Sequence, residues 1–302
     1  MVTDPKSLHY VNPSNPDILN SYQEAIISAA DILLEYDADK LVPVYGFGAN
    51  LNFPNLKTTG ASHCFPCSGD PKDDERPGIE GIFEVYNYAI RHVSLNGPTN
   101  FEPLFRKILN TCKEKQVENP DNYCFFMVIT DGEIHDFDKT ADVIVEACDH
   151  PMSIVIIGVG NEAFQRMRDF DEGHFTNRLG QKPKRDIVRF VKFNDFKQSR
   201  MALSQEVLKE IPIQVEQFYT MMGRKPNPPK TPNRSFAHLN SARPNVATNL
   251  TSVPINRPNL AVPTVVGSPY SPQMVELVMQ PAKAPVPYSP NRGGMNYPAA
   301  PG

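Results

Sequence analysis

Several features that would point to a class of protein are scarce in this chain of 302 residues. It contains no tryptophan, and its five cysteines lack the spacing of a disulfide framework, which excludes a small disulfide-stapled scaffold. The longest apolar stretch, residues 154–160, is far shorter than the roughly 20 residues of a membrane-spanning helix. The chain does not open with a basic and then an apolar segment, as a secretory signal does. We therefore expect a cytoplasmic protein with reduced thiols.

Basic residues are scarce in the first 222 positions. Residues 1–222 contain 22 basic and 33 acidic side chains, whereas residues 223–302 contain eight basic side chains and one acidic one. Binding to nucleic acid depends on clustered lysine and arginine that contact phosphates. The acidic part of the chain therefore argues against a nucleic-acid partner, and we expect its partners to be proteins.

The C-terminal region differs in composition from the rest. Residues 223–302 hold 16 of the 30 prolines, and their apolar residues follow no regular period. Such a segment cannot bury enough apolar surface to offset the entropy lost on ordering. We therefore predict a folded domain over residues 1–222 and a disordered, basic, proline-rich tail over residues 223–302. Pro-Tyr-Ser-Pro occurs in the tail twice, at 269–272 and 287–290, which suits either docking to a polyproline-reading partner or a plain spacer.

Hydropathy patterns predict an α/β fold for residues 1–222. The runs at 123–130 and 152–159 are almost entirely apolar, which is typical of strands buried on both faces of a parallel sheet. By the same patterns we expect strands at 41–47, 63–67, 123–130, 152–159 and 187–193, and helices at 18–36, 79–93, 101–115, 137–148, 162–168 and 200–222. Alternating elements of this kind place helices on both faces of the sheet, and ligands bind beyond the carboxyl ends of its strands.

Two polar motifs lie at that expected edge. Thr99 belongs to Gly-Pro-Thr-Asn-Phe before a helix, and Asp131 belongs to Thr-Asp-Gly at the end of a strand. With Ser-Leu-His-Tyr at 7–10, Gly-Phe-Gly-Ala at 46–49 and Arg-Asp-Ile-Val-Arg-Phe-Val at 185–191, they make residues 4–222 similar to the von Willebrand factor A-like domain of the copine family. The resemblance implies a doubly wound, mostly parallel, Rossmann-type sheet.

The resemblance also implies a divalent-metal site at the carboxyl edge of the sheet. In the family this site consists of an Asp-x-Thr-x-Ser loop, a threonine and an aspartate, and Thr99 and Asp131 match the second and third parts. Hard oxygen ligands suit Mg²⁺, Mn²⁺ or Ca²⁺ and leave a coordination position for an acidic residue of a partner. No residue matches the first part, so we expect an incomplete site. The alternative is that Thr99 caps a helix start and Asp131 a strand-to-helix turn.

The same resemblance leaves one strand unaccounted for. The implied fold needs six strands, and the hydropathy pattern predicts five, because the first, central strand has no counterpart. Its place lies between the strands at 41–47 and 123–130, so its loss leaves two strands without a hydrogen-bonding neighbour. We therefore expect a sheet that lacks its first central strand, with a gap that a neighbouring chain is able to fill.

Other residue patterns carry little chemistry by themselves. Gly-x-Gly-x-x-Ala at 158–163 follows a strand as a dinucleotide-binding turn does, but no acidic residue stands about 20 positions on to hold a ribose. Cys64 and Cys67 form a single Cys-x-x-Cys, which cannot supply the four ligands of zinc. The acidic residues of segment 70–75 could bind Ca²⁺ loosely, but they lack the glycine and the ligand spacing of an EF-hand. No nucleophile with a matching base accompanies the residues after Asp131. We expect these to be solvated loop residues, namely Asp70, Asp73, Asp74, Glu75, Glu133, His135 and Asp136.

The resemblance implies an interaction protein and not an enzyme. Family members bind phospholipid in a calcium-dependent manner through two C2 domains, which this sequence does not contain. We therefore expect protein partners at the carboxyl edge of the sheet and along the tail, and membrane contact that is weak or made through a partner. Such contact would place a cytoplasmic protein at the periphery of the plasma membrane. Two alternatives stay open: an adaptor or remnant of the copine-related RING-type ubiquitin ligases, and an incomplete gene product of a full copine.

Overall fold

The computed structural model describes residues 3–15, 17–34, 37, 39–132, 134–224 and 274–279. Its helices are α1 (Ser21–Leu34), α2 (Gly78–His92), α3 (Glu102–Glu118), α4 (Phe137–Ala147), α5 (Gln165–Asp171), α6 (Phe193–Phe196), α7 (Arg200–Leu208) and α8 (Ile211–Met221). Its strands are β1 (Leu41–Gly46), β2 (Ala49–Leu51), β3 (Phe65–Pro66), β4 (Glu75–Pro77), β5 (Val93–Leu95), β6 (Cys124–Thr130), β7 (Met152–Gly158), β8 (Val188–Lys192) and β9 (Met274–Met279). The mixed α/β class predicted from the sequence is confirmed.

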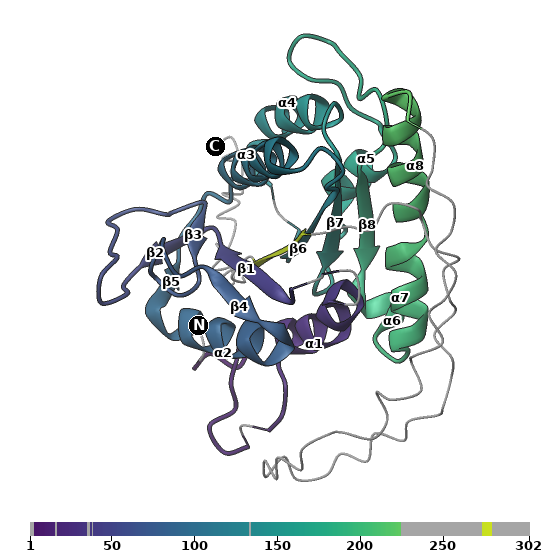
Figure 1. The fold of residues 1–302 in the computed structure, drawn as a ribbon. Helices are drawn as coiled ribbons and strands as arrows, with labels where there is room; N and C mark the ends of the chain where they lie inside the picture. Colours follow the sequence, from purple (N-terminus) through teal and green to yellow (C-terminus); the bar gives the residue numbers. More distant parts are fainter. Residues whose placement is uncertain are drawn as a thin grey trace, which may run out of the picture.

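The main sheet has the strand order β3-β1-β9-β6-β7-β8 (Figure 1). β1, β9, β6, β7 and β8 run parallel to one another, whereas β3 and β4 pair with β1 in the antiparallel sense. β2 and β5 form a separate two-stranded ribbon. The parallel arrangement brings the carboxyl ends of β1, β6 and β7 to one edge of the sheet, where the loops with Thr99 and Asp131 lie.

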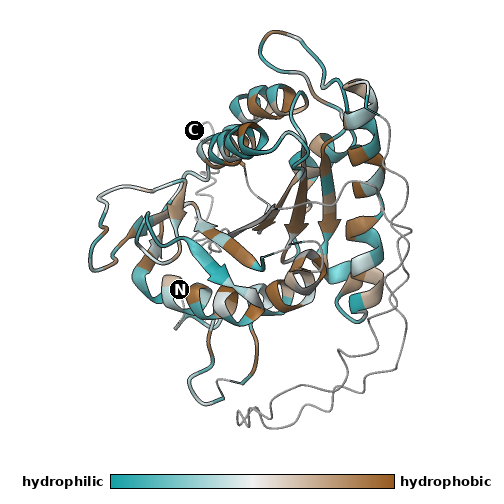
Figure 2. Ribbon diagram, in the orientation of Figure 1, coloured by the Kyte–Doolittle hydropathy of each residue, from teal (hydrophilic) through white to brown (hydrophobic). Residues whose placement is uncertain are grey.

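Helices cover both faces of the sheet. α1, α2, α7 and α8 contribute to the core on one face, and α3, α4 and α5 to the core on the other. β6 and β7 are buried along their whole length, with alternate residues in the two cores: Met127 lies in the first and Phe126 in the second. Figure 2 accordingly draws β6 and β7 largely in brown, whereas the helices alternate between brown and teal. Burial on both faces explains the continuous apolar runs of these strands.

The segment before α1 is fastened to the core. The Asn20 N–H donates to Oε1 of Gln23 at 2.8 Å, and the Gln23 N–H donates to Oδ1 of Asn20 at 2.9 Å, which is a reciprocal cap of the helix start. His9 is buried, its ring stacks on Tyr22 with 4.0 Å between centroids, and its Nδ1 lies 2.6 Å from the Tyr86 hydroxyl. These contacts give the Ser-Leu-His-Tyr motif a structural role.

Some predicted elements differ from the structure in ways that the chain explains. The predicted helix 200–222 is two helices, α7 and α8, because Pro212 lies in the first turn of α8 and has no N–H with which to continue α7. The predicted strand 63–67 is reduced to the two residues of β3. The short strands β2, β4 and β5 were not predicted, because three residues are too few to show a hydropathy period.

The largest difference from the prediction lies at the centre of the sheet. β9 lies between β1 and β6, where the sequence predicted an empty position, and it belongs to the region predicted as a disordered tail. The prediction of an empty central position is therefore wrong for this structure, whereas disorder of residues 223–302 stays a prediction. The reason is that a short apolar segment pairs with strands on both sides. Residues 225–273 and 280–302, with both Pro-Tyr-Ser-Pro motifs, lie outside the described residues, so the boundary at residue 222 stays a prediction.

Candidate functional site at the carboxyl edge of the sheet

Thr99 lies in the loop between β5 and α3, and its main chain is tied to the loop after β6. The Thr99 N–H donates to Nδ1 of His135 at 3.1 Å, and the His135 N–H donates to the Thr99 carbonyl oxygen at 2.9 Å. Thr99 is only 3% exposed. A Cβ on Gly48, just beyond β1, would lie 4.0 Å from Oγ1 of Thr99. Segments that follow β1, β5 and β6 thus meet at Thr99.

Asp136 caps α3 from across this edge. Its Oδ1 accepts the Phe101 N–H at 2.8 Å, and its Oδ2 accepts the Glu102 N–H at 2.9 Å. A carboxylate in this place satisfies main-chain donors and faces the positive end of the helix. The prediction of a merely solvated loop residue is therefore wrong for Asp136, whereas His135 is exposed as predicted and in addition bonds to Thr99. Thr99 is not the cap of α3, because Asp136 has that role, and Glu133 lies outside the described residues.

Asp131 follows the last residue of β6 and is 8% exposed. Burial raises the pKa of Tyr22 in α1, and the charge of Asp131 raises that pKa further. Asp131 is not the residue that precedes α4, because Asp136 has that position. The alternative of a turn cap at Asp131 therefore gains no support from the start of α4.

Two glycines of this edge are explained by packing. Gly132 has a φ of +99°, and a Cβ there would clash with the ring of Phe164. A Cβ on Gly158 would lie 2.7 Å from the same ring. Phe164 thus fills the space that Gly132 and Gly158 leave. Gly160 has a φ of +100°, and a Cβ there would lie 3.1 Å from the Leu8 side chain, so both glycines of the pattern at 158–160 have a structural reason.

The remaining sequence patterns also have structural roles. Burial raises the pKa of Cys67 to about 12, which leaves this thiol unreactive at neutral pH. In the acidic segment, Asp73 pairs with Arg76 at 2.9 Å, and Asp74 accepts a hydrogen bond from the Tyr45 hydroxyl. Asp74 is therefore part of the contact between this loop and β1, and the expectation of a solvated side chain is wrong for it.

Two oxygen donors that the sequence predicted lie in loops at this edge. Thr99 supplies a hydroxyl and Asp131 a carboxylate, each from its own loop. His135 and Asp136 already bond to main-chain atoms of the loop before α3. Within the described part of the chain, no group of three or more His, Cys, Asp or Glu side chains could hold a metal.

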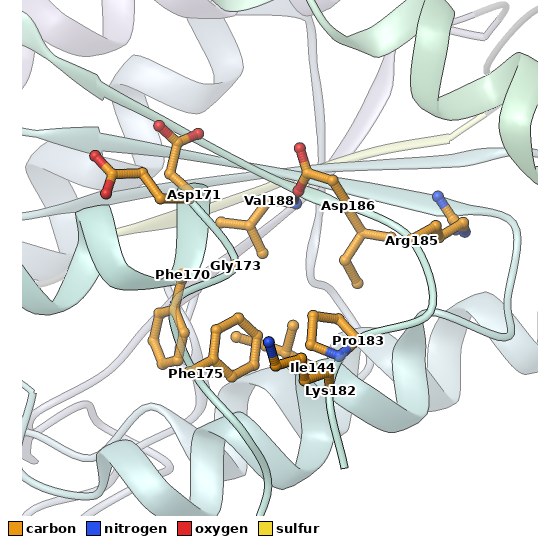
Figure 3. A pocket seen from close by; sticks show the side chains of 12 residues that line it. Ile144, Phe170, Asp171, Gly173, Phe175, Lys182, Pro183, Arg185, Asp186 and Val188 are labelled. Atoms are coloured by element: carbon orange, nitrogen blue, oxygen red, sulfur yellow. Dashed lines mark hydrogen bonds between the residues drawn. The ribbon is translucent and has the colours of Figure 1, made fainter.

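One hollow with charged and apolar side chains in its wall lies near the start of β8, away from the carboxyl edge of the sheet. It has a volume of about 350 Å³ and lies between Ile144 of α4, Phe170 of α5 and Val188 at the start of β8 (Figure 3). Its charged side chains already hold the fold together: the Asp186 carboxylate accepts the Val188 N–H at 3.0 Å, and the Arg185 guanidinium donates to the Cys148 carbonyl at 2.9 Å. The hollow therefore shows no set of groups poised for chemistry.

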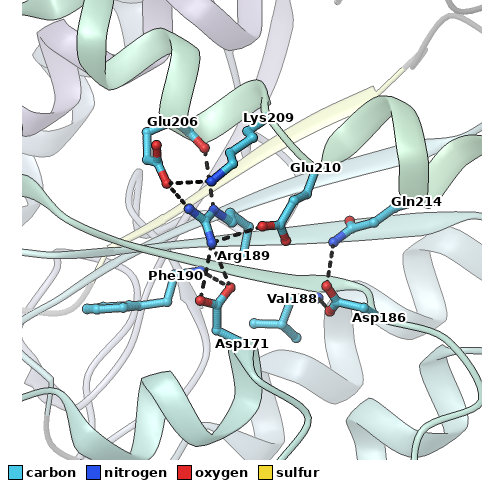
Figure 4. A network of polar contacts seen from close by, with 9 residues as sticks. All are labelled: Asp171, Asp186, Val188, Arg189, Phe190, Glu206, Lys209, Glu210 and Gln214. Carbon is cyan, nitrogen blue, oxygen red and sulfur yellow. Dashed lines mark hydrogen bonds and ion pairs between the residues drawn. The ribbon is translucent and has the colours of Figure 1, made fainter.

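A network of charges centred on Arg189 connects β8 with helices on both of its faces (Figure 4). The guanidinium lies 3.3 Å from Asp171 at the end of α5 and 3.1 Å from Glu210 at the start of α8, and it pairs with Glu206 of α7. The Asp171 carboxylate also accepts the Phe190 N–H at 3.0 Å. This network positions α5, α7 and α8 and does not reach the carboxyl edge.

Comparison with known proteins shows which family this domain represents. Residues 7–227 match the family model described as Copine. The chain belongs to the copine family. It is 38% identical over 214 residues to Copine-C of Dictyostelium discoideum, which covers 70% of this chain and 39% of the relative. It is 37% identical over 229 residues both to Copine-D of that organism, covering 74% and 41%, and to Protein BONZAI 1 of Arabidopsis thaliana, covering 74% and 38%.

This copine-family chain spans about two fifths of the length of the relatives that it matches. The stretch that matches the family model includes Thr99 and Asp131 and all elements from α1 to α8. It ends at residue 227, well before β9 begins at Met274. The central strand of the sheet therefore comes from a part of the chain that the family model does not cover.

Proposed function

We propose that this copine-family domain is a non-enzymatic protein-interaction module of the von Willebrand factor A type. The carboxyl edge of its sheet would present a divalent cation, Mg²⁺, Mn²⁺ or Ca²⁺, to an acidic residue of a protein partner. Thr99 and Asp131 would be its direct ligands, and water would complete the coordination shell. When bound, the cation supplies the positive charge that attracts a carboxylate.

The observation that carries the proposal is the pair of hydrogen bonds between Thr99 and His135. They join the loop that holds Thr99 to the loop that begins with Asp131, which supports a shared location of the Thr99 hydroxyl and the Asp131 carboxylate at one edge. Asp136 reinforces the arrangement, because it anchors the start of α3 directly after the Thr99 loop. A fixed pair of oxygen donors at this edge supports a binding role in preference to catalysis.

In this proposal the protein contacts a membrane only weakly or through a protein partner. The relatives' family property, calcium-dependent phospholipid binding, belongs to longer chains of which this one covers about two fifths. Among the residues that the structure describes, no helix is both long and apolar enough to span a membrane. The eight basic side chains of residues 223–302 are spread over the whole region, and a basic residue contributes about 1 kcal/mol only close to an anionic surface. We propose a cytoplasmic protein whose contact with the plasma membrane is therefore weak or made through a protein partner, bound at the sheet edge or along the proline-rich tail.

Thermal unfolding of the full chain with and without each cation tests the metal site. A ligand that binds only the folded state raises Tm, and a gain of 1 kcal/mol corresponds to about 2–4 °C for a domain of this size. We expect Mg²⁺ or Mn²⁺ at millimolar concentration to raise the Tm of the wild-type protein, and Asp131→Asn and Thr99→Val to abolish the rise.

Asp138→Asn is the matched control. Asp138 is an exposed acidic residue of α4, so its replacement removes the same charge as Asp131→Asn at a position away from the proposed site. It should keep the full metal response. An equal rise in Asp131→Asn and Asp138→Asn would show that the cation binds elsewhere, and no rise in the wild-type protein would refute the metal-dependent mode of binding.

A further inference from the structure

β9 pairs with β6 over its whole length and with β1 over its second half. Val44, Tyr45 and Gly46 of β1 align with Leu277, Val278 and Met279. On the other side, all six residues of β9 align with consecutive residues of β6, from Cys124 to Ile129. Figure 1 shows β9 in yellow at the centre of the sheet. Both ladders are parallel, so the segment lies in the sheet as an ordinary central strand does.

The strands on either side of β9, β1 and β6, contribute residues to the apolar cores on both faces of the sheet. Val44, Met127 and Ile129 belong to the core on one face of the sheet, and Tyr45, Phe126 and Val128 belong to the core on the other. A backbone in this position is flanked by apolar cores above and below and by two strands at its sides. Because buried main-chain N–H and C=O groups need partners, β1 and β6 both depend on the strand between them.

The sequence of β9 suits this position in all but one residue. Met-Val-Glu-Leu-Val-Met is apolar at five positions, and Glu276 is the single acidic residue among residues 223–302. No proline occurs in these six residues, although 16 prolines lie in residues 223–302, and proline is the residue that a central strand excludes. The segment is thus a proline-free, apolar stretch within a region that is otherwise unsuited to a sheet.

The chain that connects α8 to β9 is long enough for β9 to leave its place in the sheet and be replaced by another segment. β9 is three strand positions away from β8, or about 14 Å across the sheet. Residues 225–273 connect α8 to β9, and a chain of that length can span far more than this distance. The length of the connection therefore does not by itself fix the position of the strand.

We propose that the space between β1 and β6 is a binding groove for one extended, mainly apolar segment in parallel orientation, and that Met274–Met279 is its ligand, bound in cis. The C-terminal region completes the sheet of its own domain, and the stability of the domain depends on that occupancy. This site lies inside the sheet and is independent of the cation proposed for Thr99 and Asp131.

Hydrogen exchange of the full-length protein, followed by mass spectrometry, tests the assignment. Peptides that cover residues 274–279 should be as protected as those that cover β1 and β6. Leu277→Pro removes a main-chain donor from a strand with neighbours on both sides, so protection should be lost in all three segments together. Val266→Pro introduces a proline into the same region outside β9 and is the matched control, which should exchange like the wild-type protein.

Rescue in trans separates loss of the strand from general misfolding. A synthetic peptide of residues 271–282, added to the Leu277→Pro protein, should restore protection of β1 and β6, whereas a peptide of the same composition in shuffled order should not. Binding of the peptide with no effect of metal on its affinity would agree with a site separate from the proposed cation site.

Three results would overturn the proposal. The first is rapid exchange of residues 274–279 in the wild-type protein, whatever the variants do. The second is equal protection of β1 and β6 in Leu277→Pro and Val266→Pro. The third is a wild-type dimer that Leu277→Pro converts to monomer, because the strand would then occupy the groove of a neighbouring chain and not its own.

Discussion

Replacement of Arg189 by methionine should be one of the most destabilising single changes in this domain. The Arg189 side chain is 11% exposed and forms ion pairs with three carboxylates. The side chains of these partners, Asp171, Glu206 and Glu210, are 16%, 28% and 28% exposed. Methionine keeps an unbranched apolar stem, so the change removes the charge while it keeps most of the packing. The result is three carboxylates close together with no cation among them.

The size of the effect follows from the exposure of these groups. Hydrogen bonds to charged groups contribute about 1.5–3 kcal/mol each, and removal of one partner of a buried ion pair costs about 3–5 kcal/mol. Water can reach Glu206 and Glu210 in part, which reduces the loss. We therefore expect Arg189→Met to lower the free energy of unfolding by about 3 kcal/mol, at the low end of the range for a buried pair.

The loss should also depend on pH. Burial raises the pKa of Asp171, while the Phe190 N–H and Arg189 oppose that rise. Without Arg189 the rise is larger. A carboxyl whose pKa is raised in the folded state favours folding below its unfolded pKa, near 3.9, and this contribution is lost as the pH rises through the folded pKa. Arg189→Met should therefore be more destabilised at pH 7.5 than at pH 5.

Urea unfolding of the full chain at these two pH values measures both effects. Arg178→Met is the control, because the Arg178 side chain is 62% exposed and pairs with a single carboxylate, Asp142, and such surface pairs contribute at most about 1 kcal/mol. The reasoning is refuted if the two variants lose the same stability, or if the loss in Arg189→Met does not shrink at the lower pH.

Three further predictions concern the cap of α1, the raised pKa of Asp186 and the packing of Gly132 against Phe164. Asn20→Ala removes one half of the reciprocal cap with Gln23 and should lower the free energy of unfolding in urea by about 1 kcal/mol; an unchanged midpoint would contradict the cap. Burial raises the pKa of Asp186 to about 6, so wild-type stability should fall as the pH rises from about 4 to 6, and Asp186→Asn should show a smaller fall in urea midpoints; parallel curves would disprove this role. Gly132→Ala places a methyl group against Phe164 at a positive φ and should lower Tm by several degrees, a loss of more than about 1 kcal/mol; a Tm equal to that of the wild type would rule out the clash.

The sequence correctly predicts three of the buried parallel strands. β6, β7 and β8 lie within the predicted runs 123–130, 152–159 and 187–193, because strands covered on both faces need apolar residues at every position and the pattern is visible locally. It also predicts that Thr99 and Asp131 share an edge, since loops after parallel strands meet at the carboxyl ends. Their roles as cation ligands stay a prediction for the metal-dependent unfolding experiment.

Contacts between distant parts of the chain could not be predicted in this way. The cap of α3 comes from Asp136, which lies 35 residues beyond Phe101 in the sequence, and only the folded loop after β6 brings the two together. The break between α7 and α8, in contrast, was visible in the sequence at Pro212 and was missed because the apolar spacing continues across it.

The sequence by itself determines that this chain forms an α/β domain of the copine family with two oxygen donors at one sheet edge, because hydropathy and motifs are local properties. Only the tertiary structure decides which segment completes the sheet. Met274–Met279 resembles many short apolar segments, and its place is set by main-chain pairing with β1 and β6, which are far away in the sequence. Main-chain hydrogen bonds are nearly independent of side-chain identity, so the strand between β1 and β6 could be identified only from the fold.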